Sequence, residues 1–370
     1  MTKNSLMSHL LIFISVVLTL LAGMGSGLAR LGWQMDTLSS NWILIHGPLM
    51  IGGFLGTLLC MERAVALASR YPWAIAVPII NALGAFALLI LPNAMLAKLL
   101  LSAGSLGLLA LFGLMLRLHP TKDVLVMAFG ALCWVIGKVL WLVGNPIYQV
   151  VHLWIAFLIL TIVGERLELS RVRHLTRRSE QLFVLSVGVY LLGVSITIFN
   201  LDIGVRVVGV GAIFMALWLL RYDIARRTIL QTGLTRYIAA CLLSGYVWLA
   251  FGGLMAIWKG AVYTGFDYSL ILHAFLLGFV FSMIFGHMPI ILPALTNLRI
   301  AYTPLFYGHL ILLHITLIVR TTGNLLQSIP VRQWGGLLNV LTILLFMFIT
   351  IVTIIRSNRL TRSQQRSSNF

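Results

Sequence analysis

Six histidines lie inside apolar segments of this 370-residue chain, and they are the residues best suited to chemistry. They are His46, His152, His273, His287, His309 and His314. An imidazole surrounded by hydrocarbon needs a partner, which is either another polar side chain or a metal ion. A hydrogen bond between helices readily explains one such histidine, whereas six of them in one chain favour metal ligation.

The spacing of these histidines predicts two layers. The first three each follow the start of an apolar segment by a few residues, and the three segments run in the same direction, so these imidazoles are expected at similar depth. His287 follows His273 by fourteen residues, which places it about 21 Å deeper in an α-helix. His309 is expected in that deeper layer, with His314 nearer the middle of the membrane.

Two layers of histidines predict two metal centres in a helical bundle. Haem iron takes axial imidazoles from facing helices, and copper also binds neutral imidazole. We therefore expect a haem between His46 and His273, with His152 close by. His287, with His309 or His314, is expected to form a second haem or copper site.

Small and soft residues surround the first predicted site. Glycines that let a flat macrocycle or a helix backbone approach closely are Gly47, Gly52, Gly53, Gly56, Gly278 and Gly286. Ordinary small-residue packing between membrane helices is the more common reason for any one of these glycines. Met50, one turn after His46, is an alternative soft ligand, although methionine in an apolar helix usually serves packing.

The elements that position these histidines must be membrane helices. Hydrophobic residues make up 60% of the chain, charged residues only 9%, and mean hydropathy is +1.01, which excludes a soluble globular enzyme. The net charge of +17 comes from basic residues in short loops, which indicates membrane topology rather than nucleic-acid binding. The three cysteines, in apolar segments, have no metal-binding spacing.

We predict an all-α, polytopic membrane protein in which residues 1–370 form one transmembrane domain. Twelve apolar segments are long enough to span a bilayer: 9–29, 42–66, 72–91, 94–118, 123–144, 146–166, 181–200, 203–221, 236–258, 268–294, 303–320 and 334–355. Of the Lys and Arg residues, 19 fall on the side of the N-terminus and 6 on the other, which predicts cytoplasmic termini. Residues 356–370 are then a polar, basic cytoplasmic tail.

A weak internal repeat is visible in three of these segments. They read HGPLMIGGFLGTLLCMER from His46, HLWIAFLILTIVGER from His152 and HAFLLGFVFSMIFGH from His273. Because the leading histidines are four spans apart each time, the pattern favours three four-helix units around a pseudo-threefold axis. The alternative is that apolar helices simply look alike.

The charged residues inside the spans are few. Asp and Glu are absent from the middle of the predicted membrane, whereas proton pumps and ion-coupled carriers usually need such carboxylates. Lys138 is the one cation within a span. It either extends its ammonium group to the membrane surface or pairs with a haem propionate, and the first is the more common behaviour.

The three histidine-bearing segments resemble the NnrS-like family of bacterial haem- and copper-containing membrane proteins. The resemblance implies twelve spans, a bacterial inner membrane, haem binding and a link to nitric oxide. The layout also resembles subunit I of the haem–copper oxidases, which implies low-spin haem ligation by His46 and His273 and copper ligation by His152. Two departures argue against an oxygen-reducing centre: residues 181–200 lack a His-His pair, and the tenth span lacks His-x-His.

We therefore expect a membrane protein with a b-type haem, and with a second haem or copper. It is expected to bind a gas such as nitric oxide, or to transfer electrons with a redox partner or another membrane subunit; no particular reaction follows from the sequence. Two alternatives remain. One is a transporter for haem, a metal or a small solute, and the other is a non-catalytic subunit of a respiratory membrane complex.

Overall fold

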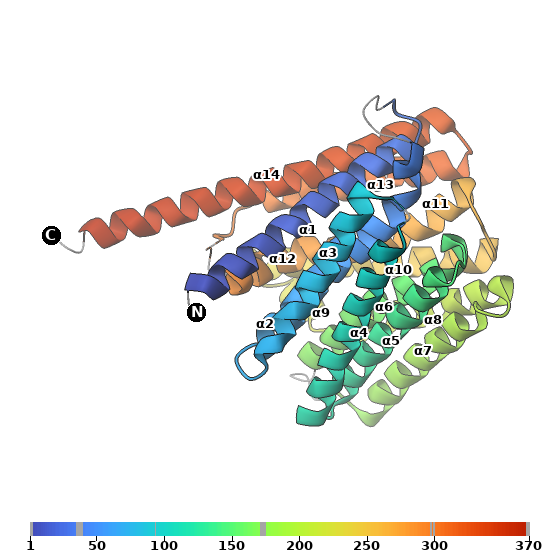
Figure 1. The fold of residues 1–370 in the computed structure, drawn as a ribbon, viewed down its shortest axis with the longest axis horizontal. Coiled ribbons are helices and arrows are strands. Elements are labelled where there is room, and N and C mark those ends of the chain that lie inside the picture. The colour runs from blue at the N-terminus through green and yellow to red at the C-terminus, as the bar shows by residue number, and fades with distance from the viewer. Residues whose placement is uncertain are drawn as a thin grey trace.

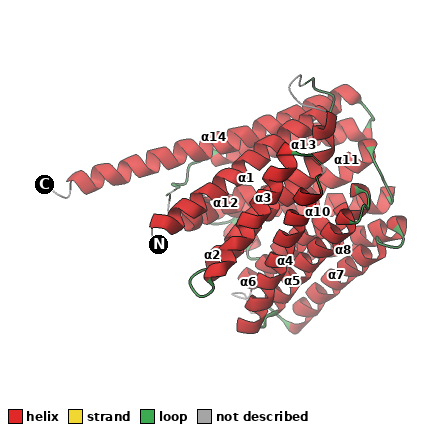
Figure 2. Cartoon of the chain, viewed as in Figure 1, coloured by secondary structure: helices red, strands yellow, loops and turns green. Residues whose placement is uncertain are grey.

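The chain is a bundle of long helices in a computed structural model that describes residues 3–34, 40–92, 94–170, 175–296, 298 and 300–367 (Figures 1 and 2). No strand occurs among these residues, which confirms the all-α prediction. Arg171, Arg173 and Arg299, which contribute to the predicted orientation, lie outside the described residues, as does the 368–370 end of the predicted tail.

The helices follow one another with short connections. They are α1 (Lys3–Arg30), η1 (Ser40–Ile45), η2 (Pro48–Leu55), α2 (Gly56–Leu67), η3 (Pro72–Ile75), α3 (Ala76–Ile90), α4 (Met95–Leu118), α5 (Lys122–Leu142), α6 (Ile147–Ser170), α7 (Arg177–Ile196), α8 (Leu201–Tyr222), α9 (Ala225–Thr228), α10 (Gly233–Lys259), α11 (Gly265–His273), η5 (Ala274–Phe281), α12 (Ser282–Thr296), α13 (Phe306–Leu325) and α14 (Ile329–Ser367).

Among the described residues, eleven helices are long and apolar enough to cross a membrane. The chain is therefore a multi-pass membrane protein. Eleven of the twelve predicted spans fall on these helices, and the remaining one, 303–320, falls on the 20-residue helix α13, which is less apolar because it carries two histidines and an arginine. The twelfth crossing and the threefold grouping stay predictions.

Local sequence sets the helix boundaries. Pro48 and Pro72 stand in the first turns of η2 and η3, where a missing N–H costs nothing. The side chain of Asn200 accepts a hydrogen bond from the backbone N–H of Ile203 and so caps α8. Gly144, with φ of 103°, lies between α5 and α6 and adopts a conformation that side chains disfavour.

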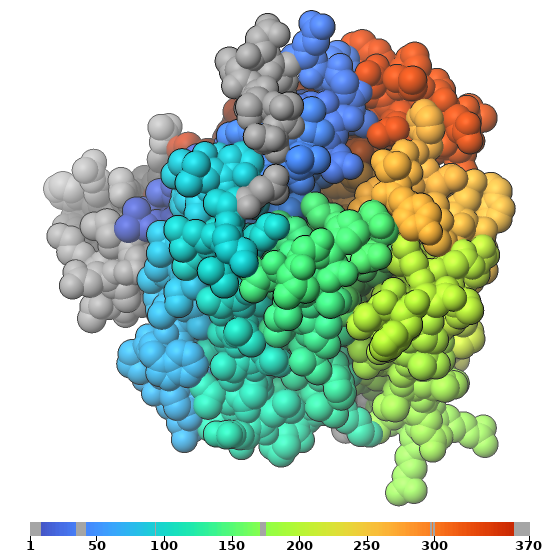
Figure 3. Space-filling model, turned by 45° about the vertical axis from the view of Figure 1, so that its right-hand side comes forward, coloured from blue at the N-terminus to red at the C-terminus, as the bar shows by residue number. Residues whose placement is uncertain are grey.

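Helices that are neighbours in sequence pack side by side. In the space-filling view, the cyan, green and yellow-green segments follow one another across the face (Figure 3). The start of α1 and the end of α14 lie at the same end of the bundle (Figure 1). Large apolar side chains on the outer faces are exposed, as lipid contact requires; examples are Leu99, Leu106, Leu185, Leu192 and Ile311.

The three segments with leading histidines form the centre of the bundle. We compared the share of buried residues in the apolar 18-residue window of each candidate span. This share is 83% for Gly265–Thr296, 78% for Ile147–Ser170 and 67% for Pro48–Leu67. These shares exceed those of the other eight candidate spans. The segments that the sequence singles out are thus the ones least exposed to lipid.

Candidate functional site

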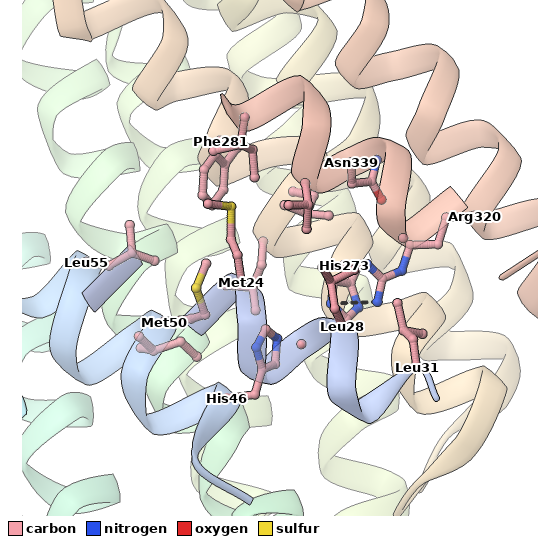
Figure 4. Close-up of a pocket in the computed structure, with 17 residues that line it drawn as sticks. Met24, Leu28, Leu31, His46, Met50, Leu55, His273, Phe281, Arg320 and Asn339 are labelled. Carbon is pink, nitrogen blue, oxygen red and sulfur yellow. Dashed lines mark hydrogen bonds between the residues drawn. The ribbon is translucent and has the colours of Figure 1, made fainter. Parts of the chain in front are cut away.

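His46 and His273 come together, as expected from their similar depth. Their ring centroids lie 6.4 Å apart and their planes differ by only 19° (Figure 4). His46 directly precedes the Gly47–Pro48 start of η2, and His273 is the last residue of α11, just before η5. The pair lies beside the last turns of α1, at the end of the bundle away from the chain termini.

Each imidazole is fixed through its Nδ1 atom. His46 Nδ1 lies 2.8 Å from the carbonyl oxygen of Gly23 on α1, and His273 Nδ1 lies 2.7 Å from that of Ser269, one turn earlier. Since a carbonyl only accepts, both Nδ1 atoms carry the proton, and both Nε2 atoms keep a free electron pair. This is the tautomer in which Nε2 serves as a metal ligand.

The two Nε2 atoms have different surroundings. No described residue donates a hydrogen bond to His46 Nε2. His273 Nε2 accepts one from Arg320 Nη2 at 3.1 Å (Figure 4).

Both histidines are followed by a π-helical segment of eight residues, η2 after His46 and η5 after His273. The π-helix is rare and occurs most often at functional sites. Phe54 and Phe281, each eight residues after its histidine, also meet, with ring centroids 5.9 Å apart. The two π-helical segments therefore come together at Phe54 and Phe281 as well as at the histidines that precede them, and no sequence pattern indicates this widened geometry.

The cavity between these segments is mostly apolar. Its own volume is only about 60 Å³. Met24 and Leu28 of α1, Met50 of η2 and Leu276 of η5 line it together with the two imidazoles. A second cavity, of about 420 Å³ and so within the range of about 300–1,000 Å³ typical of small-molecule sites, shares both imidazoles, Met50 and Leu276 with it. This cavity extends to the end of α1 and the start of α11, where its mouth lies.

The mouth of the cavity is basic. Arg30, Arg320 and Arg332 all line it. Arg320 is only 8% exposed, and its described partners are the neutral groups His273 Nε2 and, at 3.4 Å, Ser269 Oγ. No described carboxylate pairs with Arg320, and a buried guanidinium without an anion is costly. The mouth is therefore suited to a ligand that brings negative charge.

Sequence reasoning missed two parts of this site. Arg320 is the last residue of the predicted span 303–320 and is expected at the membrane surface, but α13 continues to Leu325 and brings it into the bundle. The glycines of α1 were also missed: a Cβ on Gly27 would lie 2.9 Å from His46 Cε1, so only glycine leaves room for the ring. The spacing Gly23-x-Gly25-x-Gly27 was the available signal.

His152 is buried near this site but does not line either cavity. Its neighbour Val151 lines the outer one, whereas His152 Nε2 has no hydrogen-bond partner among the described residues. Lys138 is completely buried, so extension to the membrane surface is the wrong interpretation for it, and it lines neither cavity.

The three deeper histidines have separate surroundings. Tyr237 OH lies 2.9 Å from His309 Nε2, and Trp248 Nε1 donates to His314 Nδ1 at 3.0 Å. His287 Nδ1 is bonded to the carbonyl of Met283 at 2.8 Å. No group of three or more His, Cys, Asp or Glu that could hold a metal occurs in the described part of the chain.

The π-helical segment η5 also changes the relation between His273 and His287. The expected depth and direction of His287 assumed an uninterrupted α-helix, but more residues are needed per turn in a π-helix. The direction of His287 relative to His273 therefore does not follow from an α-helical count, whereas its absence from the cavity that contains His273 agrees with the expected difference in depth.

The pair fits the haem that the sequence predicts. Metal–imidazole bonds are about 2.0–2.1 Å long, and each ring centre lies about 1 Å beyond its nitrogen, so two ligands of one iron have centroids about 6 Å apart. The observed 6.4 Å agrees with that separation. Two unprotonated Nε2 atoms, of which only His273 Nε2 already has a hydrogen-bond partner among the described residues, an apolar cavity and a basic mouth are features that suit a haem with two propionates.

Comparison with known proteins gives a family without a described activity. Residues 9–355 match the model of a family described as a domain of unknown function, DUF8744. No curated protein and no solved structure matches the chain.

Proposed function

We propose that this protein, which belongs to the DUF8744 family, binds one b-type haem between His46 and His273 in a bacterial inner membrane. The observation that carries the proposal is the pair of near-parallel imidazoles with centroids 6.4 Å apart. Both rings are held through Nδ1, so once the Arg320 hydrogen bond to His273 breaks, both Nε2 atoms would be available to iron.

The two parts of the cavity match the two parts of a haem. The apolar part, with Met24, Leu28 and Leu276, suits the macrocycle, while the arginines at the mouth suit the two propionates. Arg320 is the best placed of these arginines because it is buried and has no described anionic partner. With haem bound, the Arg320 guanidinium would donate its hydrogen bond to a propionate carboxylate instead of to the neutral His273 Nε2.

Bound haem would supply a one-electron redox centre. A bis-histidine iron has no open coordination position, so this site favours electron transfer to a redox partner over catalysis. Gas binding, which the resemblance to NnrS-like proteins suggests for nitric oxide, would require a haem held by only one of the two histidines. Arg320 is placed to hold His273 Nε2 in that state.

The membrane arrangement belongs to the same proposal. α13 is 20 residues long and packs against α14, and we assign it as a twelfth crossing, which leaves both termini on the cytoplasmic side. The haem then lies near the outer face. A second haem or copper site at His287, His309 or His314 remains a prediction that no contact among these residues supports.

One observation favours the transporter alternative. Arg320 occupies His273 Nε2 by a hydrogen bond that must break before a metal binds, which is suitable for a site that loads and releases haem. A transporter of this kind would be purified with little haem and would bind added haem reversibly.

A visible spectrum of the purified protein tests the proposal. We expect a reduced-minus-oxidised difference spectrum of low-spin b-type haem, with one haem per chain. His46→Ala and His273→Ala should each lower the haem content by about tenfold or more, because each removes one axial bond. His152→Ala, a buried histidine outside the cavity, is the matched control and should keep its haem.

Two results would contradict the proposal. One is a wild-type protein that binds no haem, even when haem is added to membranes or to the detergent-purified chain. The other is full haem content in both His46→Ala and His273→Ala.

A further inference from the structure

Each π-helical segment carries a glycine that a large side chain from a neighbouring helix contacts closely. Gly52 of η2 lies six residues after His46, and a Cβ there would be 2.6 Å from Lys138 Nζ. Gly278 of η5 lies five residues after His273, and a Cβ there would be 2.4 Å from Trp248 Cγ. The two contacts differ by one residue in register and in the side chains that make them, but each presses on the backbone of a π-helical segment.

Lys138 is held against Gly52 by aromatic rings. Its Nζ lies 4.5 Å from the ring centroid of Trp154 and 5.0 Å from that of Trp141, and Trp134 contributes a third ring at 5.8 Å. No described residue accepts a hydrogen bond from this fully buried ammonium group. Attraction to the three ring faces therefore replaces a counter-ion and fixes the position of Nζ.

The same turn of η2 has a second support. Asn81 Nδ2, from α3, donates hydrogen bonds to the carbonyl oxygen of Gly52 at 2.8 Å and to Thr57 Oγ1 at 2.9 Å. Ile51, the residue before Gly52, lines the cavity with His46. Lys138 and Asn81 consequently hold the back of the segment whose front faces the candidate haem site.

Trp248 is held against Gly278 by a hydrogen bond. Its Nε1 donates to His314 Nδ1 on α13 at 3.0 Å, which fixes the orientation of the indole ring. Phe251 packs edge-on against the same ring, with centroids 5.4 Å apart. His314 therefore acts on η5 through Trp248, and this accounts for a half-buried histidine that does not reach the cavity.

We propose that Lys138 and the Trp248–His314 pair are positioning residues that hold η2 and η5 so that the His46 and His273 rings stay nearly parallel. This inference rests on the proposed haem site. It gives Lys138 and His314 a role that does not require them to touch the ligand. In a bis-histidine haem, the angle between the two imidazole planes determines the shape of the low-spin ferric electron paramagnetic resonance spectrum.

The test is that spectrum, recorded on the purified ferric protein. The 19° angle between the ring planes predicts the rhombic spectrum of near-parallel ligands for the wild type. Lys138→Met and His314→Leu should each keep the haem but shift the largest g value upward, as expected when the planes turn towards perpendicular. The reduction potential should fall in Lys138→Met, because a fixed positive charge near the iron disfavours the ferric state.

Conservative and control variants separate positioning from general packing. Lys138→Arg keeps a cation on the indole faces, and His314→Asn keeps an acceptor for Trp248 Nε1, so both should restore the wild-type spectrum. Lys98→Met is the matched control: Lys98 Nζ also lies over Trp141, at 5.1 Å, but does not contact Gly52. This control should leave both the spectrum and the potential unchanged.

The possible outcomes test the positioning role separately from the proposed haem binding. A wild-type protein without haem would overturn both. A haem-loaded protein whose spectrum is the same in wild type, Lys138→Met and His314→Leu would overturn the positioning role alone. If either variant fails to accumulate in membranes, Trp248→Phe takes its place. This substitution removes the N–H donor and one ring, and a shifted or an unchanged spectrum is then interpreted in the same way.

Discussion

The ring of Phe54 packs against the ring of Phe281, with centroids 5.9 Å apart, and each phenylalanine follows a cavity histidine by eight residues. The His46–His273 and Phe54–Phe281 contacts thus mark the two ends of a pair of parallel π-helical segments. Because the cavity lies between those ends, the phenylalanine pair determines how far apart the segments are at its inner side.

Loss of the phenylalanine contact should be measurable as a coupling energy. In a double-mutant cycle of Phe54→Leu and Phe281→Leu, we expect the two rings to couple by about 0.5–1.5 kcal/mol, the usual range for aromatic pairs. Unfolding of the detergent-solubilised protein measures it. Phe54→Leu combined with Phe251→Leu, whose ring packs instead against Trp248, should be additive, and a similar coupling in that second cycle would refute the assignment.

Gly27→Ala should displace the His46 ring. The added methyl group would lie 2.9 Å from His46 Cε1, which is closer than Cβ contacts occur, so either the ring or α1 must shift. We expect haem content to fall several-fold while the protein still folds. Gly25→Ala is the control on the same helix, since nothing lies within 4 Å of its Cβ position, and equal haem content in both variants would argue against the geometry.

Arg320→Gln should weaken haem binding without changing the iron ligands. A charge-assisted hydrogen bond contributes about 1.5–3 kcal/mol, so the dissociation constant should rise by about 10- to 100-fold. A haem titration of the apoprotein measures the change. Arg206→Gln is the control because Arg206 is exposed and bonded to Asp202. Unchanged affinity in Arg320→Gln would mean that the propionates bind elsewhere.

The buried ion pair between Arg166 and Asp223 should contribute strongly to stability. Arg166 Nε and Nη2 donate to the two carboxylate oxygens at 2.8 and 2.9 Å, and the pair joins α6 to the end of α8. Arg166→Met should cost about 3–5 kcal/mol because it leaves a carboxylate buried without its guanidinium partner. Thermal unfolding measures this cost, and Arg166→Met with Asp223→Leu should recover part of it. A double variant no more stable than the single one would contradict this account.

The amino-acid sequence by itself determined the class of the protein and the residues most suited to ligation. Long apolar runs require helices in a membrane, because only a helix satisfies its own backbone in hydrocarbon, and eleven of the predicted spans are confirmed. The equal depth of His46 and His273 follows from counting residues along two spans that cross in the same direction. These properties are local to each segment, so one sequence is enough to find them.

The tertiary structure decided which of the predicted residues share a site. Depth alone could not tell that His152 would lie outside the cavity, or that His309 and His314 would each bond to a different residue of α10. A residue's direction depends on helix rotation, and the π-helical turns of η2 and η5 change that rotation without a recognisable sequence signal. Arg320 shows the same limit: hydropathy identified a cation at a helix end, and only packing of α13 against α14 and η5 buried it beside His273.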